Sequence, residues 1–197
     1  MRGTSFDRIE PHVKQTPLSA DGLMPVRRPT ARRPRLDRLS ATGIGEFRTL
    51  FAEASPVTAA DFARLDGDVA MRSFPAVGQR VLGALMARPT YFWVGKSFRH
   101  TTESVALGHN VFTALGGVRA MNFVATVGRS VVDGRPAVCL DYTTRPGVPE
   151  SARGIYDELR EIEPGLWLGP SYFRTRGRRL PMGWFALDAS VPFDAVI

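Results

Sequence analysis

Residues 154–188 read GIYDELREIEPGLWLGPSYFRTRGRRLPMGWFALD, and Pro164-Gly165 and Arg176-Gly177 interrupt this stretch. Glycine adopts the left-handed backbone conformations that tight turns require, so each dipeptide predicts a reversal of the chain. The segments beside the turns are rich in aromatic and large apolar residues and have the length of strands. We predict an antiparallel meander with strands at about 154–163, 166–175 and 181–188.

The same pattern extends toward the N-terminus. Asp133-Gly134 separates two further strand-like segments, 118–131 and 136–143, and is a strong hairpin signal. An aromatic strand is predicted at about 91–100, and a weaker extended segment lies near 109–115. A meander of this length favours a small barrel around an apolar cavity.

Helices are predicted ahead of this sheet. Apolar residues at helical spacing predict a helix over 44–51 after the cap Thr42, and Thr58 with Asp61 opens a second one. A third is predicted over 74–88, until Pro89 ends it. The predicted fold class is mainly β with N-terminal helices, an antiparallel calycin-like barrel with one end covered by helices.

The length of 197 residues and a hydrophobic content of 44% suit one domain with a sizeable core. Most of the net charge of +7 comes from residues 1–40, which contain nine basic and four acidic residues. We expect an Arg/Pro-rich disordered tail over 1–40 and a single barrel domain over 41–197. The tail has three interpretations: a solvated leader, an arm over the cavity mouth, or a polyanion-binding tether.

The sequence predicts a cytoplasmic protein without a metal or other cofactor. The single cysteine, Cys139, excludes an internal disulfide and a multi-thiolate metal site. The first 30 residues hold no apolar core of the secretory kind, and no stretch approaches the roughly 20 apolar residues of a membrane span. His100 and His109 lack both the neighbouring ligands of a metal site and a haem signature.

Alternation along the aromatic strand places Lys96 on one face with Phe92, Val94, Phe98 and His100. Lys96 is one of only two lysines among the 26 basic residues. This rarity indicates that the position has a specific use for an ammonium group rather than a guanidinium group. If this face lines the cavity, desolvation lowers the lysine pKa and suits it to ligand contact, proton transfer or imine formation. The structural alternative is an ion pair with a carboxylate at the barrel rim.

The segment 155–162 is unusually charged for a strand, and alternation places Asp157 on the same face as Ile155 and Leu159. Either a solvated face with cross-strand ion pairs or a polar patch inside a cavity explains this pattern. The candidate catalytic residues are Lys96 and Asp157, and the candidate ligand-binding residues are Phe92, Val94, Lys96, Phe98, His100, Asn122, Tyr142, Arg160, Tyr172 and Trp184.

Five short motifs follow one another along the chain: Leu50-Phe51 before Pro56-Val57, Trp93-Val-Gly-Lys-Ser-Phe98, Asp141-Tyr142, Ile155-Tyr-Asp-Glu-Leu-Arg160 and Leu168-Gly-Pro170. Over about residues 46–188 their order resembles a group of bacterial calycin-like proteins named for a Gly-x-Trp-x-Gly motif. That motif has no counterpart here, since the chain reads Leu65-Asp-Gly-Asp-Val-Ala-Met-Arg72 in its place. The resemblance implies a lipocalin-like barrel and a lipophilic ligand, and it implies no catalytic residue.

Three functions remain open. The first is the binding of a hydrophobic small molecule, such as a lipid, an isoprenoid or a polyketide-like compound, in an apolar barrel cavity. The second is a cofactor-free cyclase, isomerase or hydrolyase in that cavity, with Lys96 and a carboxylate moving protons. The third is an adaptor that binds polyanions through the basic tail, without specific recognition of nucleic acid.

Overall fold

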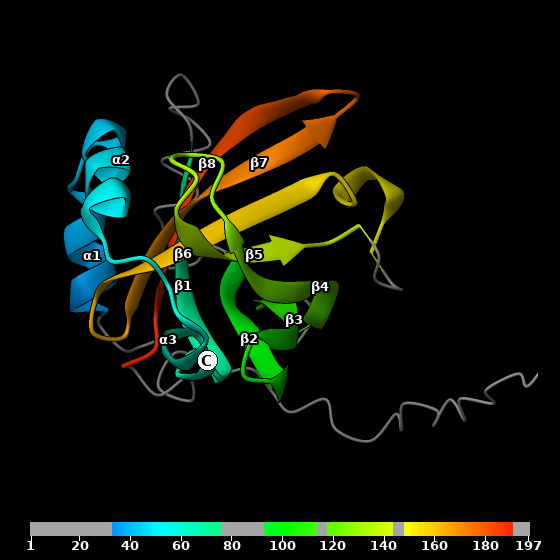
Figure 1. The fold of residues 1–197 in the computed structure, drawn as a ribbon, viewed down its shortest axis with the longest axis horizontal. Helices are drawn as coiled ribbons and strands as arrows, with labels where there is room; N and C mark the ends of the chain where they lie inside the picture. The colour runs from blue at the N-terminus through cyan, green and yellow to red at the C-terminus, as the bar shows by residue number, and fades with distance from the viewer. Residues whose placement is uncertain (1–32, 76–92, 114–117, 144–147, 191–197) are drawn as a thin grey trace, which may run out of the picture.

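The computed structural model describes residues 33–75, 93–113, 118–143 and 148–190. Eight antiparallel strands pair in sequence order and close into a barrel, because β1 also pairs with β8 (Figure 1). The predicted fold class, mainly β with helices on the N-terminal side, is confirmed. The strands are β1 (Gly67–Pro75), β2 (Trp93–Thr102), β3 (Val105–Phe112), β4 (Val118–Arg129), β5 (Pro136–Asp141), β6 (Ile155–Glu163), β7 (Leu166–Thr175) and β8 (Arg178–Asp188).

The three predicted hairpin turns are confirmed. They connect β4 to β5, β6 to β7 and β7 to β8. Gly134, Gly165 and Gly177 have φ angles of 74°, 74° and 75°, in the left-handed region that glycine enters without a steric penalty. Strand β7 has the predicted bounds because turn residues delimit it on both sides.

The predicted third helix is wrong at its start. Phe74 belongs to β1, which pairs with β2 on one side and with β8 on the other. Residues 76–88 of that predicted helix lie outside the described residues. The helical spacing of Phe74 with later apolar residues hid a strand whose core residues Val69 and Met71 are separated by two positions.

Three α-helices accompany the barrel: α1 (Pro34–Ser40), α2 (Ile44–Glu53) and α3 (Ala59–Ala63). The first two lie against the outer wall, where α1 contacts β1 and β8, and α2 contacts β6 and β7 (Figure 1). Helix α3 lies at one end of the barrel, and its Phe62 ring packs on His100 with the centroids 4.5 Å apart. The predicted capping box of Thr58 and Asp61 is present. No helix within the described residues has the length and apolarity to cross a membrane.

Residues 34–40, the last part of the predicted tail 1–40, form α1 and pack on the barrel. Leu36 is fully buried. Arg33 bonds to a backbone carbonyl of β1, and Arg35 bonds to the carboxylate at the end of β8. Part of the arginine-rich segment is therefore tied to the fold, while residues 1–32 lie outside the described residues.

Both faces of the barrel wall are buried where the helices cover it. Inside, the core includes Phe98, Phe123, Trp167 and Phe185. Outside, a second apolar cluster joins α1 and α2 to the wall and includes Phe47. A wall residue in this region can thus be buried without facing the interior.

Candidate functional site

Four fully buried polar side chains meet inside the barrel: Lys96, Asn110, Tyr142 and Asp157. The Lys96 ammonium donates to Asn110 Oδ1 at 2.8 Å and to the Tyr142 hydroxyl at 2.6 Å. It also donates to Asp157 Oδ2 at 3.0 Å. The Tyr142 hydroxyl donates to the same carboxylate oxygen at 2.9 Å. All three ammonium protons of Lys96 are thus used within the protein.

Strand register brings this polar cluster together from four parts of the chain. Lys96 of β2 and Asn110 of β3 are direct cross-strand partners. Leu140 of β5 and Asp157 of β6 are partners in the same way. Tyr142 follows Leu140 by two positions and therefore points to the same side of the sheet.

The low dielectric of the interior sets the protonation of the cluster. Burial lowers the pKa of Lys96, and the neighbouring Asp157 carboxylate opposes that shift. Burial, followed by the charge of Asp157, raises the pKa of Tyr142 well above its ordinary value. The Tyr142 phenol therefore stays protonated at neutral pH and serves as a hydrogen-bond donor to the carboxylate.

Aromatic rings surround the ammonium group. The Lys96 Nζ atom lies 5.0 Å from the ring centroid of Trp93, 5.3 Å from Phe123 and 4.9 Å from Phe185. Each distance is within the range of an attractive cation–π interaction. The polar cluster is therefore small and enclosed by apolar walls.

Among the described residues, four buried side-chain atoms have no hydrogen-bond partner: Asp188 Oδ2 at the end of β8, and Ser73 Oγ, Trp93 Nε1 and Asp157 Oδ1 on residues of the interior. Ser73 faces the interior, because it pairs across strands with the core residue Phe185. Trp93 packs against the same core. Since about 90% or more of buried polar groups in proteins have a partner, the three interior atoms are exceptions, and two of them belong to Trp93 and Asp157, which contact Lys96.

The interior contains several of the predicted site residues. His100 lies near the end occupied by α3, where its Nε2 atom is 3.1 Å from the carbonyl oxygen of Leu65. Phe92 lies outside the described residues. The predicted residues that the structure brings together in the interior are Lys96, Phe98, Tyr142 and Asp157.

Val94 does not line the interior, contrary to the placement that alternation predicts. The pairing of β2 with β3 shifts register between Trp93 and Gly95, which interrupts the alternation of side chains. Trp93 packs against the core instead, and Val94 packs against Val111 in a separate cluster. Gly95, an isolated glycine inside the strand, is the sequence signal for this bulge, and simple alternation does not take it into account.

Arg160 lies on the outer wall beneath α2 rather than in the predicted cavity. Two guanidinium nitrogens bond to the Asp133 carboxylate, each at 2.6 Å. The remaining donors reach the carbonyl oxygens of Phe51, Arg135 and Pro136. All five N–H donors are used, and Arg160 links the β4–β5 turn to α2.

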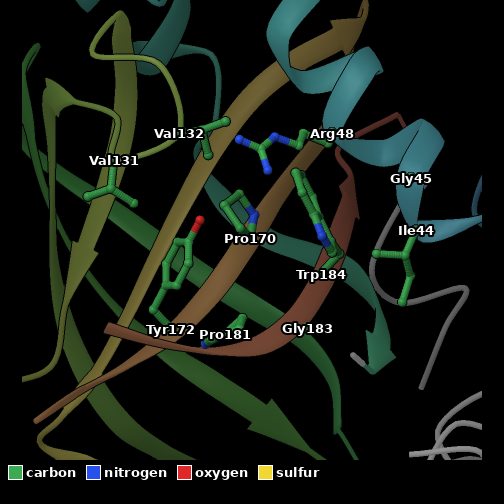
Figure 2. A pocket seen from close by; sticks show the side chains of 10 residues that line it. All are labelled: Ile44, Gly45, Arg48, Val131, Val132, Pro170, Tyr172, Pro181, Gly183 and Trp184. Carbon is green, nitrogen blue, oxygen red and sulfur yellow. The ribbon is translucent and has the colours of Figure 1, made fainter. Parts of the chain in front are cut away.

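Tyr172 and Trp184 line a groove on the outside of the barrel, as Figure 2 shows, rather than the predicted interior cavity. Asn122 is also outside, in a shallow hollow beside Ser97 and His109. The groove has a volume of about 560 Å³ and is open to solvent on one side. Its lining residues are Ile44, Gly45, Arg48, Val131, Val132, Pro170, Tyr172, Pro181, Gly183 and Trp184.

Sequence reasoning missed three residues of the interior site. Asn110 lies at the predicted extended segment near 109–115, and its pairing with Lys96 depends on where β3 begins. Ser73 directly precedes the predicted helix over 74–88 and was not assigned to a strand, and alternation places Trp93 on the face opposite Lys96. Correct strand bounds for β1 and β3 would have found Ser73 and Asn110.

The chain matches no protein-family model, and no curated protein matches it. Among solved structures it is similar to "Crystal structure of protein from Thermomonospora curvata", with 17% sequence identity and a TM-score of 0.49. The similarity covers 80% of this chain and 97% of that one. At this level of similarity no functional conclusion is drawn from it. Within the described ranges, no group of three or more His, Cys, Asp or Glu residues is placed to hold a metal ion.

Proposed function

We propose that the barrel binds a neutral, largely apolar small molecule and holds a hydroxyl group of that molecule beside Lys96 and Asp157. The observation that carries this proposal is the set of unpartnered atoms, Ser73 Oγ, Trp93 Nε1 and Asp157 Oδ1, in the apolar interior. Leaving such groups unpaired costs about 1–3 kcal/mol each. A ligand that pairs with them recovers this free energy on binding.

The hydrogen-bonding pattern favours a hydroxyl-bearing ligand over an anion. Asp157 Oδ1 is an acceptor and Trp93 Nε1 is a donor, whereas the Ser73 hydroxyl can act as either. A ligand hydroxyl both donates and accepts, so it complements this set. The positive charge of Lys96 is already balanced by Asp157 at 3.0 Å, so Lys96 does not offer an unpaired charge to an acidic ligand.

The surroundings favour a hydrocarbon body. Phe98, Phe123 and Phe185 belong to the apolar cluster around the polar residues. Apolar surface that a ligand buries against such walls contributes about 25 cal/mol per Å². The ligand class that fits is an alcohol of lipid, isoprenoid or polyketide-like type.

Native mass spectrometry of the full chain purified from its own host tests this proposal. We expect a fraction of the protein to carry a neutral molecule that is released on denaturation and contains at least one hydroxyl group. A matched preparation of Ser73→Ala or Trp93→Phe should retain less of it, because each change removes one hydrogen-bonding group. Only ligand-free protein from the host, or a bound species retained equally by both variants, would contradict the proposal.

A second candidate function is catalysis by proton transfer in the same site. Lys96 and Tyr142 both donate to Oδ2 of Asp157 and thereby orient the carboxylate. The other oxygen, Oδ1, has no partner and is available to act as a general base. Such a base could remove a proton from a bound substrate and return it at another position, as in a cofactor-free isomerase. Incubation of the co-purified molecule with the protein in D₂O should then introduce deuterium, and Asp157→Asn should abolish that exchange.

Polyanion binding by the N-terminal segment remains a prediction for residues 1–32 alone. Arg33 and Arg35 make hydrogen bonds to the barrel, and Arg38 pairs with Glu163 at 2.5 Å. These three arginines are therefore committed to α1 packing. Heparin affinity that depends on the arginines before residue 33 would support the tether interpretation.

A further inference from the structure

The outer groove of Figure 2 is separate from the interior site. Its floor is the outward face of β7 and β8, with Pro170, Tyr172 and Trp184. Helix α2 forms one side, and the turn between β4 and β5 forms the other. A volume of about 560 Å³ lies in the usual range of about 300–1,000 Å³ for small-molecule sites.

The groove is apolar except at one side. Of the lining residues that the structure describes, Arg48 alone is charged. Glu158, a buried acid in the wall behind Val131, has both oxygens occupied by the Ser130 hydroxyl at 2.5 Å and the Val131 N–H at 2.7 Å. Burial and then the Glu158 charge raise the pKa of Tyr172, so Glu158 acts on the groove from behind its wall, whereas Arg48 lies in the lining itself.

The polar groups of the groove converge. Figure 2 shows the Arg48 guanidinium and the Tyr172 hydroxyl pointing into the same space from opposite sides, with the Trp184 indole beside them. Burial raises the pKa of Tyr172, so its hydroxyl is a donor at neutral pH. Two donors at one place and flat apolar surfaces around them match an acidic group on a flat hydrophobic body.

We propose that this groove is a second binding site, for an amphipathic monoanion. Its carboxylate or sulfonate would pair with Arg48 and accept from Tyr172, and its apolar body would lie against Pro170 and Trp184. Charge complementarity selects this occupant, because the lining offers one cation and otherwise apolar contact. The proposal is independent of the interior site, whose ammonium is already paired.

Two fluorescent probes test the proposal on the full chain. The first is 1-anilinonaphthalene-8-sulfonate, which is an amphipathic monoanion, and the second is N-phenyl-1-naphthylamine, which has the same ring system without the sulfonate. We expect Arg48→Gln to weaken binding of the sulfonate by about three- to tenfold, as for a partly exposed ion pair. Binding of the uncharged probe should stay within about twofold of the wild type, because its contacts are apolar.

Three control variants locate the binding. Arg48→Lys should retain most of the sulfonate affinity, and Arg153→Gln, which removes the same charge from an exposed position outside the groove lining, should leave it unchanged. Val132→Trp should weaken both probes, because the larger side chain fills the groove.

The proposal would be overturned if Arg48→Gln weakened neither probe or both probes equally. It would also be overturned if Val132→Trp left both affinities intact, since the probes would then bind elsewhere. Sedimentation analysis of the wild type provides a further check. A dimer that Val132→Trp converts to a monomer would assign the groove to a second copy of the chain instead.

Discussion

Lys96 and Asp157 form a buried ion pair in which the carboxylate uses one oxygen and leaves the other free. The ammonium lies 3.0 Å from Oδ2, and Oδ1 has no partner. Removing two charges from water is costly, so such a pair contributes little net stability. The free Oδ1 atom, rather than a gain in stability, is the feature of this pair on which the proposed function rests.

A double-mutant cycle tests the strength of this pair. Lys96→Met or Asp157→Asn alone should each destabilise the fold by about 3–5 kcal/mol, because each leaves one buried charge uncompensated. The double variant should be more stable than either single variant, since no charge is left inside. Urea denaturation of the four proteins measures this coupling. Additive losses would show that the two groups do not interact as a pair.

Two buried serines should respond in opposite directions to removal of the hydroxyl. Ser73 Oγ has no partner, so Ser73→Ala should stabilise the ligand-free protein by about 1 kcal/mol. Ser130 donates to Glu158 at 2.5 Å, so Ser130→Ala should destabilise it by at least a similar amount. Thermal melts of both variants make the comparison. Equal losses would mean that Ser73 is satisfied in the free protein and would weaken the case for an interior ligand.

Glu158 makes the stability of the protein depend on pH. Burial raises its pKa above the ordinary value of 4.5, so just above pH 4.5 the folded state holds a proton that the unfolded state has lost. The free energy of unfolding therefore falls as pH rises through that window. Glu158→Gln keeps an acceptor and has no proton to lose, so it should become progressively more stable relative to the wild type from pH 4.5 upward. Melting temperatures of the two proteins at a series of pH values measure this difference. A difference that does not change with pH would contradict the role given to Glu158.

Helix α1 should contribute measurably to stability. Leu36 has 0% exposure in the cluster between α1 and the wall. Leu36→Ala should therefore cost about 2–5 kcal/mol in urea denaturation. Thr49→Ala, at an exposed position of α2, is the matched control and should change stability by less than about 0.5 kcal/mol. If Leu36→Ala lost no more stability than the control, the packing of α1 on the barrel would not contribute to the stability of the fold.

The strands that flank strong turn signals were predictable from the sequence. Strand β7 has its predicted bounds because Pro164-Gly165 and Arg176-Gly177 enclose it. Strand β1 was missed, because Phe74 and the apolar residues after it fit the spacing of a helix as well. Strand β3 begins at Val105, four positions before the predicted extended segment. The prediction placed its start too late because the short turn between β2 and β3 contains no glycine or proline.

Alternation identified Lys96 and Asp157, but it could not say which face of a strand is inside. Arg160, Tyr172 and Trp184 are at least partly buried on the outer wall because α2 and the β4–β5 turn cover them. A sequence pattern indicates that a residue is buried but not where. In this protein, residues are buried both in the barrel interior and between the wall and the helices outside it. Separating the interior site from the groove required the register of the strands.

Nuclear magnetic resonance of the indole groups tests the central claim most directly. The chain has three tryptophans, and Trp93→Phe identifies the Trp93 Nε1–H signal. Titration of the full chain with geraniol, an isoprenoid alcohol, should shift that signal saturably and leave the signal of Trp184 in the outer groove in place. Myrcene, a hydrocarbon of similar size without the hydroxyl, should shift it far less. A Trp93 signal unmoved by geraniol, or moved equally by both compounds, would contradict the proposed binding of a hydroxyl group inside the barrel.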